Sequence, residues 1–238
     1  MFLHKHPYKP FLFPEATRLI VGTLPPPRFT TGDLKEGDVD FCYGSRDGQL
    51  WRILDRIFYL NLAYETTDRA VTQRKEFLKK RRIGICDIVA MAEREKVDAS
   101  DLGMKNVQLR DLVRILYDYP RIDTLIFTGG NSKNGPEYFF RRHLREYGLE
   151  LVPLQTEAPR VHTVMLPLAY PHRISALRSY AQAQHRQDAR IVKTVSLTAP
   201  SGSANRAIGS MKQYQFIKDK NPDYTTFDFR VEQYKPFF

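Results

Sequence analysis

The sequence predicts an α/β fold of three layers, in which helices cover both faces of a central, mostly parallel four-stranded sheet. The first observation is alternation, because short apolar runs are separated by longer segments whose apolar residues have helical spacing. The second is the run 122–130, whose continuous apolar character and terminal Gly-Gly are typical of a buried parallel strand. The third is the run 18–22, which is short, apolar and closed by glycine.

The other elements follow in chain order. The four strands are expected at 18–22, 83–89, 122–130 and 191–199. The helices are expected at 50–60, 69–80, 106–119, 136–148 and 205–219. Asn106 is the expected N-cap of the third helix and Pro120 its stop. Functional groups in such a sheet gather at the carboxyl ends of the strands.

The chain is expected to form a single domain over 1–238, with two additions to the minimal sheet. An inserted element is expected at about 155–190, with one further apolar run at 161–166 and a helix after Pro171. The tail at 221–238 is rich in aromatic residues and is expected to pack against the body of the protein.

Composition limits the classes of function. The net charge of +10, from 37 Lys+Arg against 27 Asp+Glu, favours a partner that carries phosphates. No run of eighteen apolar residues occurs, which excludes a membrane-spanning helix. The two cysteines fit a reducing cytoplasm and exclude a four-cysteine metal site. The six histidines have no metal-ligand spacing, so we expect no bound metal. We also expect no cofactor, and a monomeric protein.

Four segments follow the four predicted strands and meet at one edge of the sheet. They are 22–29, Asp87, 128–131 and 200–207. The first and last are short loops of small residues and prolines, which let backbone N–H groups approach phosphates closely.

Four blocks in this order resemble the uracil-DNA glycosylase superfamily, in particular the branch of mismatch-specific uracil/thymine and hypoxanthine-DNA glycosylases. The blocks are 21-VGTLPPP-27, 43-YGSRDGQLWRILDRIF-58, 75-KEFLKKRRIGICDIVAMAERE-95 and 195-VSLTAPSGSANRAIGSM-211. The resemblance runs from about residue 16 to 220, without the insertion. It implies a monofunctional enzyme that flips a damaged base out of double-stranded DNA and hydrolyses its N-glycosidic bond.

Asp47 is the predicted catalytic residue. Mismatch-specific relatives place a water-positioning Asn in the first block, where this chain has Leu24. The hypoxanthine branch places an Asn shortly before the Trp, and the ungapped match here is Gly48, beside Asp47. We therefore expect Asp47 to activate water. The alternatives are that Asp47 only caps the following helix, or that Asp40 or Ser45 has the catalytic role.

The resemblance also implies a base-binding set. Asp87 follows the second strand, where an ionised carboxylate would accept a hydrogen bond from a ring N–H or an exocyclic amine. Tyr43 or Phe41 would stack on the flipped base, and Thr23 and Asn131 complete the set. A buried, structurally paired Asp87 and a core position for either aromatic are the alternatives.

The predicted DNA-binding residues lie in the first and last loops. They are Pro25, Pro26, Ser201, Ser203, Asn205 and Arg206. Relatives that stabilise the departing base carry His or Asn before Pro-Ser, whereas this chain has Ala199, which cannot donate a hydrogen bond. Helix capping by Ser203 or Asn205 is the alternative, and it is compatible with DNA contact.

Three functions remain open from the sequence. The first is a glycosylase for uracil or hypoxanthine, localised in the cytoplasm and associated with the nucleoid through DNA. The second is the same chemistry on a bulkier modified cytosine, as in phage DNA, in an anti-phage defence. The third is a non-catalytic DNA-binding protein on the same scaffold, against which the presence of Asp47 and Asp87 argues.

Overall fold

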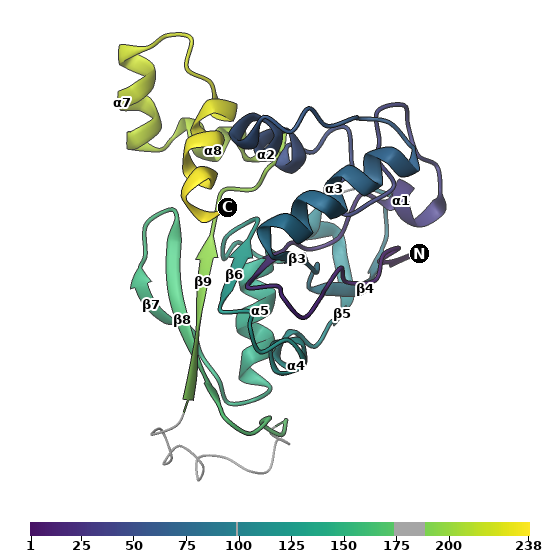
Figure 1. The fold of residues 1–238 in the computed structure, drawn as a ribbon, viewed down its shortest axis with the longest axis vertical. Helices are drawn as coiled ribbons and strands as arrows, with labels where there is room; N and C mark the ends of the chain where they lie inside the picture. Colours follow the sequence, from purple (N-terminus) through teal and green to yellow (C-terminus); the bar gives the residue numbers. More distant parts are fainter. Residues whose placement is uncertain (99, 174–188) are drawn as a thin grey trace.

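The computed structural model describes residues 1–98, 100–173 and 189–238. Its centre is a six-stranded sheet, and Figure 1 shows helices packed around it. The strand order is β3 (Ile83–Ile85), β2 (Arg18–Val21), β6 (Thr124–Phe127), β9 (Ala189–Ser196), β8 (Arg160–Pro167) and β7 (Val152–Gln155). The first four strands are parallel, and they are the four that the sequence predicts. The prediction of a four-stranded sheet is wrong, because the antiparallel strands β8 and β7 extend it into a mixed sheet.

The extension comes from the region expected as an insertion. β8 pairs with β9 along its whole length, from Arg160 opposite Ser196 to Pro167 opposite Ala189. Antiparallel strands need only a short connection, so β7 and β8 form a hairpin on the edge of the parallel sheet. The helix predicted after Pro171 lies outside the described residues.

Helices cover both faces of the sheet, as the sequence predicts. On β2, Leu19 and Val21 pack against one cluster of core residues, and Ile20 packs against the other. The first face is covered by α4 (Leu112–Asp118) and α5 (Pro136–Arg145). The second is covered by α2 (Leu50–Phe58), α3 (Asp68–Arg81) and α8 (Thr226–Tyr234).

A second sheet lies beside the first and was not predicted. It consists of β1 (Phe2–Lys5), β4 (Val89–Arg94) and β5 (Met104–Leu109), all antiparallel. The predicted helix start at Asn106 is wrong, because Asn106 lies in β5, with a φ of 47°. Asp111 caps α4 instead, since its side chain accepts a hydrogen bond from the Arg114 N–H.

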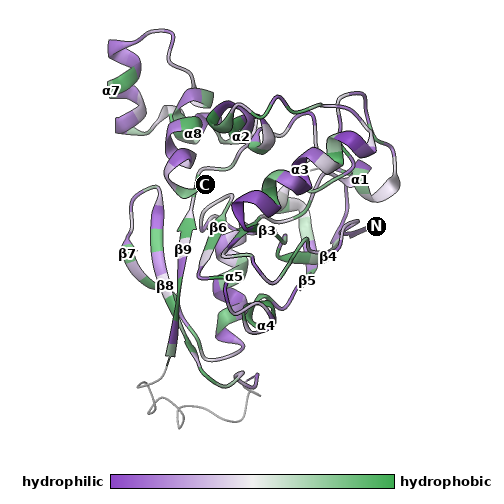
Figure 2. Cartoon of the chain, viewed as in Figure 1, coloured by the Kyte–Doolittle hydropathy of each residue, from purple (hydrophilic) through white to green (hydrophobic). Residues whose placement is uncertain are grey.

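The helix expected at 205–219 is two helices. α6 (Asn205–Gly209) ends at a glycine, and α7 (Lys212–Lys220) follows. Figure 1 shows α7 projecting from the body of the protein, and Figure 2 colours α3 largely purple, as expected of a helix with one face in water. In the part of the chain that the structure describes, the remaining α-helix is α1 (Pro27–Thr31), in the loop after β2.

The aromatic tail packs against α2. α8 begins with a capping box between Thr225 and Asp228. Tyr234 and Phe238 are buried in the same core cluster as α2, and Arg18 donates hydrogen bonds to the carbonyl oxygens of Phe237 and Phe238. Among the described residues no helix combines the length and the apolar character that crossing a membrane requires.

Candidate active site

Three parallel strands bring their carboxyl ends together around a buried carboxylate. Asp87 follows β3, Gly22 follows β2 and Thr128 follows β6. The Gly22 N–H donates a hydrogen bond of 3.1 Å to Oδ1 of Asp87, which is only 5% exposed. The side chain is therefore fixed by backbone at the edge where the sequence predicts the site.

Position 22 requires glycine, because two side chains approach its backbone closely. A Cβ atom at this position would lie 2.2 Å from Oη of Tyr43 and 2.8 Å from Oδ1 of Asp87. No side chain fits between these two groups without displacing one of them. The glycine that closes the first strand thus brings the Tyr43 phenol and the Asp87 carboxylate to the same point.

Tyr43 is held in an unusual backbone conformation. Its φ of 58° lies in the left-handed region, which costs free energy for a residue with a side chain. Its hydroxyl lies 2.9 Å from Oγ1 of Thr128, which itself donates to the Val21 carbonyl, so Tyr43 is the donor. Burial raises the pKa of the Tyr43 phenol, and the Asp87 charge raises it further, so the phenol stays protonated.

The segment around Tyr43 is a tight loop tied to α2. A Cβ atom on Gly44 would lie 1.8 Å from the Val39 carbonyl oxygen, so only glycine closes this turn. Trp51 anchors the loop, because its indole N–H donates to the Cys42 carbonyl at 2.8 Å. Phe41 is 6% exposed and packs against Phe11 and Trp51, so it belongs to the core beneath the site.

His6 completes the Asp87 environment, and sequence reasoning missed it. Nε2 of His6 lies 2.9 Å from Oδ2 of Asp87, and Nδ1 accepts a hydrogen bond from the Tyr8 N–H. Since Nδ1 is an acceptor, the proton is on Nε2, and the neutral imidazole donates to Asp87. The two residues are 81 positions apart, and no local pattern in the sequence connects them.

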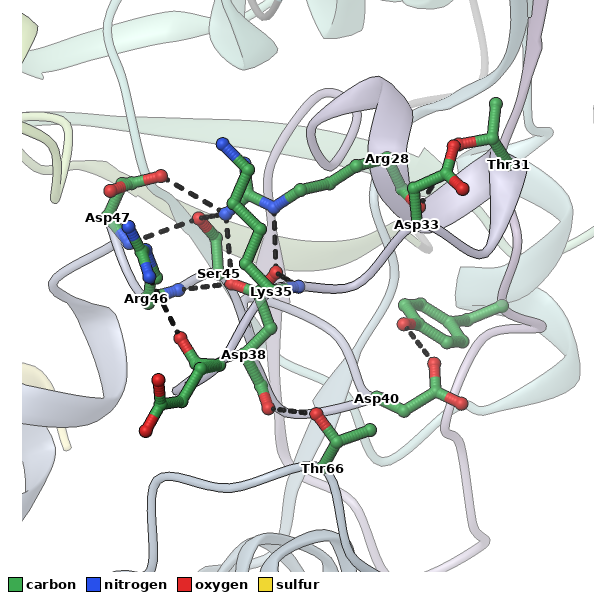
Figure 3. Close-up of polar contacts among 12 residues, drawn as sticks. Arg28, Thr31, Asp33, Lys35, Asp38, Asp40, Ser45, Arg46, Asp47 and Thr66 are labelled. Carbon is green, nitrogen blue, oxygen red and sulfur yellow. Dashed lines mark hydrogen bonds and ion pairs between the residues drawn. The ribbon is translucent and has the colours of Figure 1, made fainter.

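Asp47 lies in a different, exposed cluster (Figure 3). Its side chain is 68% exposed and its Oδ2 is 3.1 Å from Nη2 of Arg28. Arg28, on α1, also binds the buried Asp38 through two hydrogen bonds of 2.7 and 2.9 Å. The capping alternative for Asp47 is wrong, because the N-cap of α2 is Gln49 and no side chain caps it.

Asp38 stabilises the loop that carries Asp47. Burial alone would raise the pKa of Asp38, but hydrogen bonds from Arg28 and from the backbone N–H groups of Arg46 and Lys35 outweigh it and lower the pKa to about 2. Asp38 is thus a fixed negative charge that orients Arg28, and Arg28 in turn contacts Asp47 and Ser45.

The loop after β9 meets the Asp47 loop. Gly48 and Ser201 form an isolated antiparallel bridge, and the Gln49 N–H donates to the Pro200 carbonyl at 2.8 Å. Arg230, buried on α8, fixes this loop by donating to the carbonyls of Ala199 and Ser201. The structure therefore brings the second and fourth sequence blocks into direct contact.

The predicted DNA-binding residues have different degrees of exposure. Ser203 and Arg206 are exposed, and Ser201 shares a hydrogen bond with Ser203. The side-chain oxygen of Asn205 accepts a hydrogen bond from Arg230. Capping of α6 by Ser203 or Asn205 is wrong, because its N-cap is Ala204 without a side-chain hydrogen bond.

The remaining predicted residues lie in the loops after β2 and β6. Pro25 is buried, Pro26 and Thr23 are half-buried, and Asn131 is exposed. The Thr23 carbonyl accepts a hydrogen bond from the Val89 N–H, which attaches this loop to β4. Across the described ranges, no three His, Cys, Asp or Glu side chains are grouped so that they could hold a metal ion.

Comparison with known proteins gives a likeness to solved structures. No protein-family model matches the chain, and no curated protein matches it. Among solved structures, the chain is similar to a solution NMR structure described as "a putative Uracil DNA glycosylase from Methanosarcina acetivorans", with 16% sequence identity and a TM-score of 0.48. The match covers 97% of this chain and 99% of the other.

Proposed function

We propose that the chain is a monofunctional DNA glycosylase, which holds a base extruded from double-stranded DNA and hydrolyses its N-glycosidic bond to leave an abasic site. The observation that carries the proposal is the Asp87 carboxylate, which hydrogen bonds from the Gly22 N–H and from His6 fix, with the Tyr43 hydroxyl on the same glycine. Uracil and hypoxanthine are the proposed bases, because each has a ring N–H that can donate a hydrogen bond to a carboxylate.

Asp87 has the capacity to read a base edge. Each carboxylate oxygen has two lone pairs, and the described hydrogen bonds from Gly22 and His6 use one on each oxygen. An ionised Asp87 only accepts, so it selects a base with a donor at that edge. The proposed base-binding set also includes Tyr43, which lies against Gly22, and Thr23 and Asn131 from the loops after β2 and β6.

Asp47 is the proposed water-activating group. In the reaction the bond between C1′ and the base nitrogen breaks, and its electron pair leaves with the base. A water oxygen bonds to C1′, and Asp47 accepts a proton from that water, which then passes to the departing base or to solvent. The exposure of Asp47 gives water access, and Arg28 at 3.1 Å holds the carboxylate in place.

The loops after β2 and β9 are the proposed DNA contacts. Pro25 and Pro26 give the first loop a rigid backbone, and Ser201, Ser203 and Arg206 offer hydroxyl and guanidinium donors to phosphates. Asn205 contributes by holding the second loop to Arg230. The net charge of +10 supplies the attraction to the DNA backbone that does not depend on sequence.

The experiment is a panel of end-labelled duplexes, each with one uracil, hypoxanthine or modified cytosine. After incubation, hot alkali cleaves the strand wherever a base has been released. Cleavage at uracil or hypoxanthine supports the proposal. The matched pair of variants is Asp47→Asn, which should lose this cleavage, and Asp223→Asn, an exposed carboxylate elsewhere in the chain, which should keep it. Cleavage at modified cytosine alone indicates the second substrate class, and salt-sensitive binding without cleavage indicates the non-catalytic function.

A further inference from the structure

A cavity of about 500 Å³ lies beside the proposed active site and has no part in the chemistry described above. Its walls are the N-terminal segment, from Lys5 to Pro10, and residues of β4, β5 and the turn after β5. His6 is part of the lining and also bonds to Asp87, so one side chain separates the cavity from the proposed base-reading carboxylate.

The lining of the cavity is positively charged. It includes Lys5, Lys9 and Arg110, and none of the described residues that line it is acidic. Arg110 is held in place, because its Nη2 donates to the Tyr8 carbonyl at 2.7 Å and its backbone N–H donates to the Ile88 carbonyl. These features favour an anionic ligand.

The same lining also carries a fixed aromatic ring and apolar groups. Tyr8 donates its hydroxyl to Oδ1 of Asp40 at 2.7 Å and packs edge-on against Phe29, so the ring position is set. Met91 and two prolines of the N-terminal segment supply apolar surface. A cationic wall combined with an aromatic and apolar wall is the chemistry that binds a phosphate together with an unpaired base.

We propose that this cavity is a second nucleotide subsite, which binds the phosphate and the unpaired base of the nucleotide next to the one whose base Asp87 reads. The assignment rests on the proposed function, because it takes DNA as the ligand. It adds a preference to that function: the strand must be open beside the target base, so single-stranded or locally unpaired DNA binds more tightly than a perfect duplex.

The first experiment measures how DNA binding depends on salt, by fluorescence anisotropy of a single-stranded oligonucleotide. The double variant Lys5→Gln/Lys9→Gln removes two cations of the cavity, and Lys79→Gln/Lys80→Gln, on exposed positions of α3, removes two cations elsewhere. The slope of log K against log salt is negative, and we expect its magnitude to decrease by roughly 1 to 2 in the cavity variant only. Equal effects of the two variants, or no effect of the first, would overturn the subsite.

The second experiment identifies the source of the phosphate. The methyl signal of Met91 is followed by NMR while the oligonucleotide, deoxycytidine 5′-monophosphate or inorganic phosphate is added. A shift with the oligonucleotide at much lower concentration than with the mononucleotide supports the DNA subsite. Equal affinity for the mononucleotide, or a shift with inorganic phosphate alone, contradicts it.

The outcomes separate the subsite from the proposed function. If the salt slope is reduced in the cavity variant alone but the wild-type protein releases no base, the subsite stands and the proposed glycosylase activity is contradicted. If bases are released and the salt slope is the same in wild type and cavity variant, the activity stands and the subsite falls.

Discussion

Asp87 lies just after β3, whereas Asp47 lies in the loop between α1 and α2, and the surroundings of the two carboxylates are opposite. Asp87 is 5% exposed, and it accepts hydrogen bonds from a backbone N–H and a neutral histidine. The Asp47 side chain is 68% exposed and pairs with Arg28, which is itself fixed by Asp38. A rigid, dry carboxylate suits recognition of a fixed base edge, whereas an exposed one suits exchange of a proton with water.

The comparison teaches how surroundings can give one residue type two different roles. Under the proposed function, the buried Asp87 would read the base and the exposed Asp47 would activate water. The Asp87 environment is built by backbone approach at Gly22, and the Asp47 environment is built by an ion-pair cluster on a loop. Substitutions near Asp87 and substitutions near Asp47 should therefore differ in their effects on base release and on the free energy of unfolding.

The largest effect is expected from Gly22→Ala. The new methyl group would lie 2.2 Å from the Tyr43 hydroxyl and 2.8 Å from Asp87, so both side chains must move. A displacement of about 1 Å at a reacting site costs on the order of 100-fold in rate, and we expect at least that loss of base release in single-turnover assays. Gly130→Ala is the matched control, because a Cβ there meets no atom within 4 Å; equal losses in the two variants would contradict the account.

A smaller effect on stability is expected from Arg28→Gln. The change leaves the buried Asp38 without its charged partner, though backbone donors remain, and should cost about 2 kcal/mol of unfolding free energy. Because the folded pKa of Asp38 is lowered to about 2, its contribution is present above its unfolded pKa of about 3.9 and is lost as pH falls toward 2. Urea unfolding at pH 7 measures the cost of the substitution, and a second measurement at pH 3 shows how much of the Asp38 contribution is lost in acid.

The control for this prediction is Arg46→Gln. Arg46 contacts Asp38 through its backbone N–H, which the substitution retains. Wild type should lose stability between pH 5 and pH 2 more steeply than Arg28→Gln does, with Arg46→Gln following wild type. An unchanged acid profile in Arg28→Gln would show that the Arg28–Asp38 pair does not stabilise the Asp47 loop.

An intermediate effect on base release is expected from His6→Ala. The variant removes the Nε2–H donor to Asp87, so the carboxylate loses one of its two described hydrogen bonds to fixed groups. We expect base release about tenfold slower. His6→Gln can still donate from its side-chain amide and should recover part of the rate; no difference between the two variants would remove His6 from the site.

The smallest effect is expected from Tyr43→Phe. The ring and its backbone conformation stay, and only the hydrogen bond to Thr128 is lost. The expected cost is about 1 kcal/mol of unfolding free energy, measured by thermal denaturation, with a change in base release of a few-fold. A loss as large as that of Gly22→Ala would mean that the Tyr43 hydroxyl itself takes part in the chemistry.

Much of the fold could be predicted from the sequence because its signals are local. The four parallel strands each have a continuous apolar run, and α2, α3 and α5 each have an apolar face at helical spacing. The sheet of β1, β4 and β5 could not be predicted in this way, because β1 pairs with a strand nearly ninety positions away. The apolar run at 161–166 is visible in the sequence, and the structure has it within β8. Its place in the central sheet could not be predicted, because the residues of one strand do not specify which strand it pairs with.

The candidate site was predictable to the same limit. The sequence points to Asp87 by its place after a predicted strand and to Tyr43 as an aromatic residue of the second block, and the structure puts both against Gly22. His6 and Arg28 were missed, because each acts through a partner that is distant in the sequence or carried by another loop. Phe41 could not be separated from Tyr43 by sequence, since only the left-handed backbone at Tyr43 turns one ring toward the sheet edge and leaves the other in the core.

The most direct test of the division between the two carboxylates is single-turnover base release by Asp47→Asn and Asp87→Asn, each measured on uracil and hypoxanthine duplexes. If Asp47 activates water, Asp47→Asn slows release of both bases by a similar factor, on the order of 100-fold or more. If Asp87 reads the ring N–H that both bases share, Asp87→Asn weakens the capture of both bases, so a higher enzyme concentration is needed to reach half of the maximal single-turnover rate. Near-wild-type release by Asp47→Asn, or an unchanged half-saturating enzyme concentration for both bases in Asp87→Asn, would contradict the proposed roles.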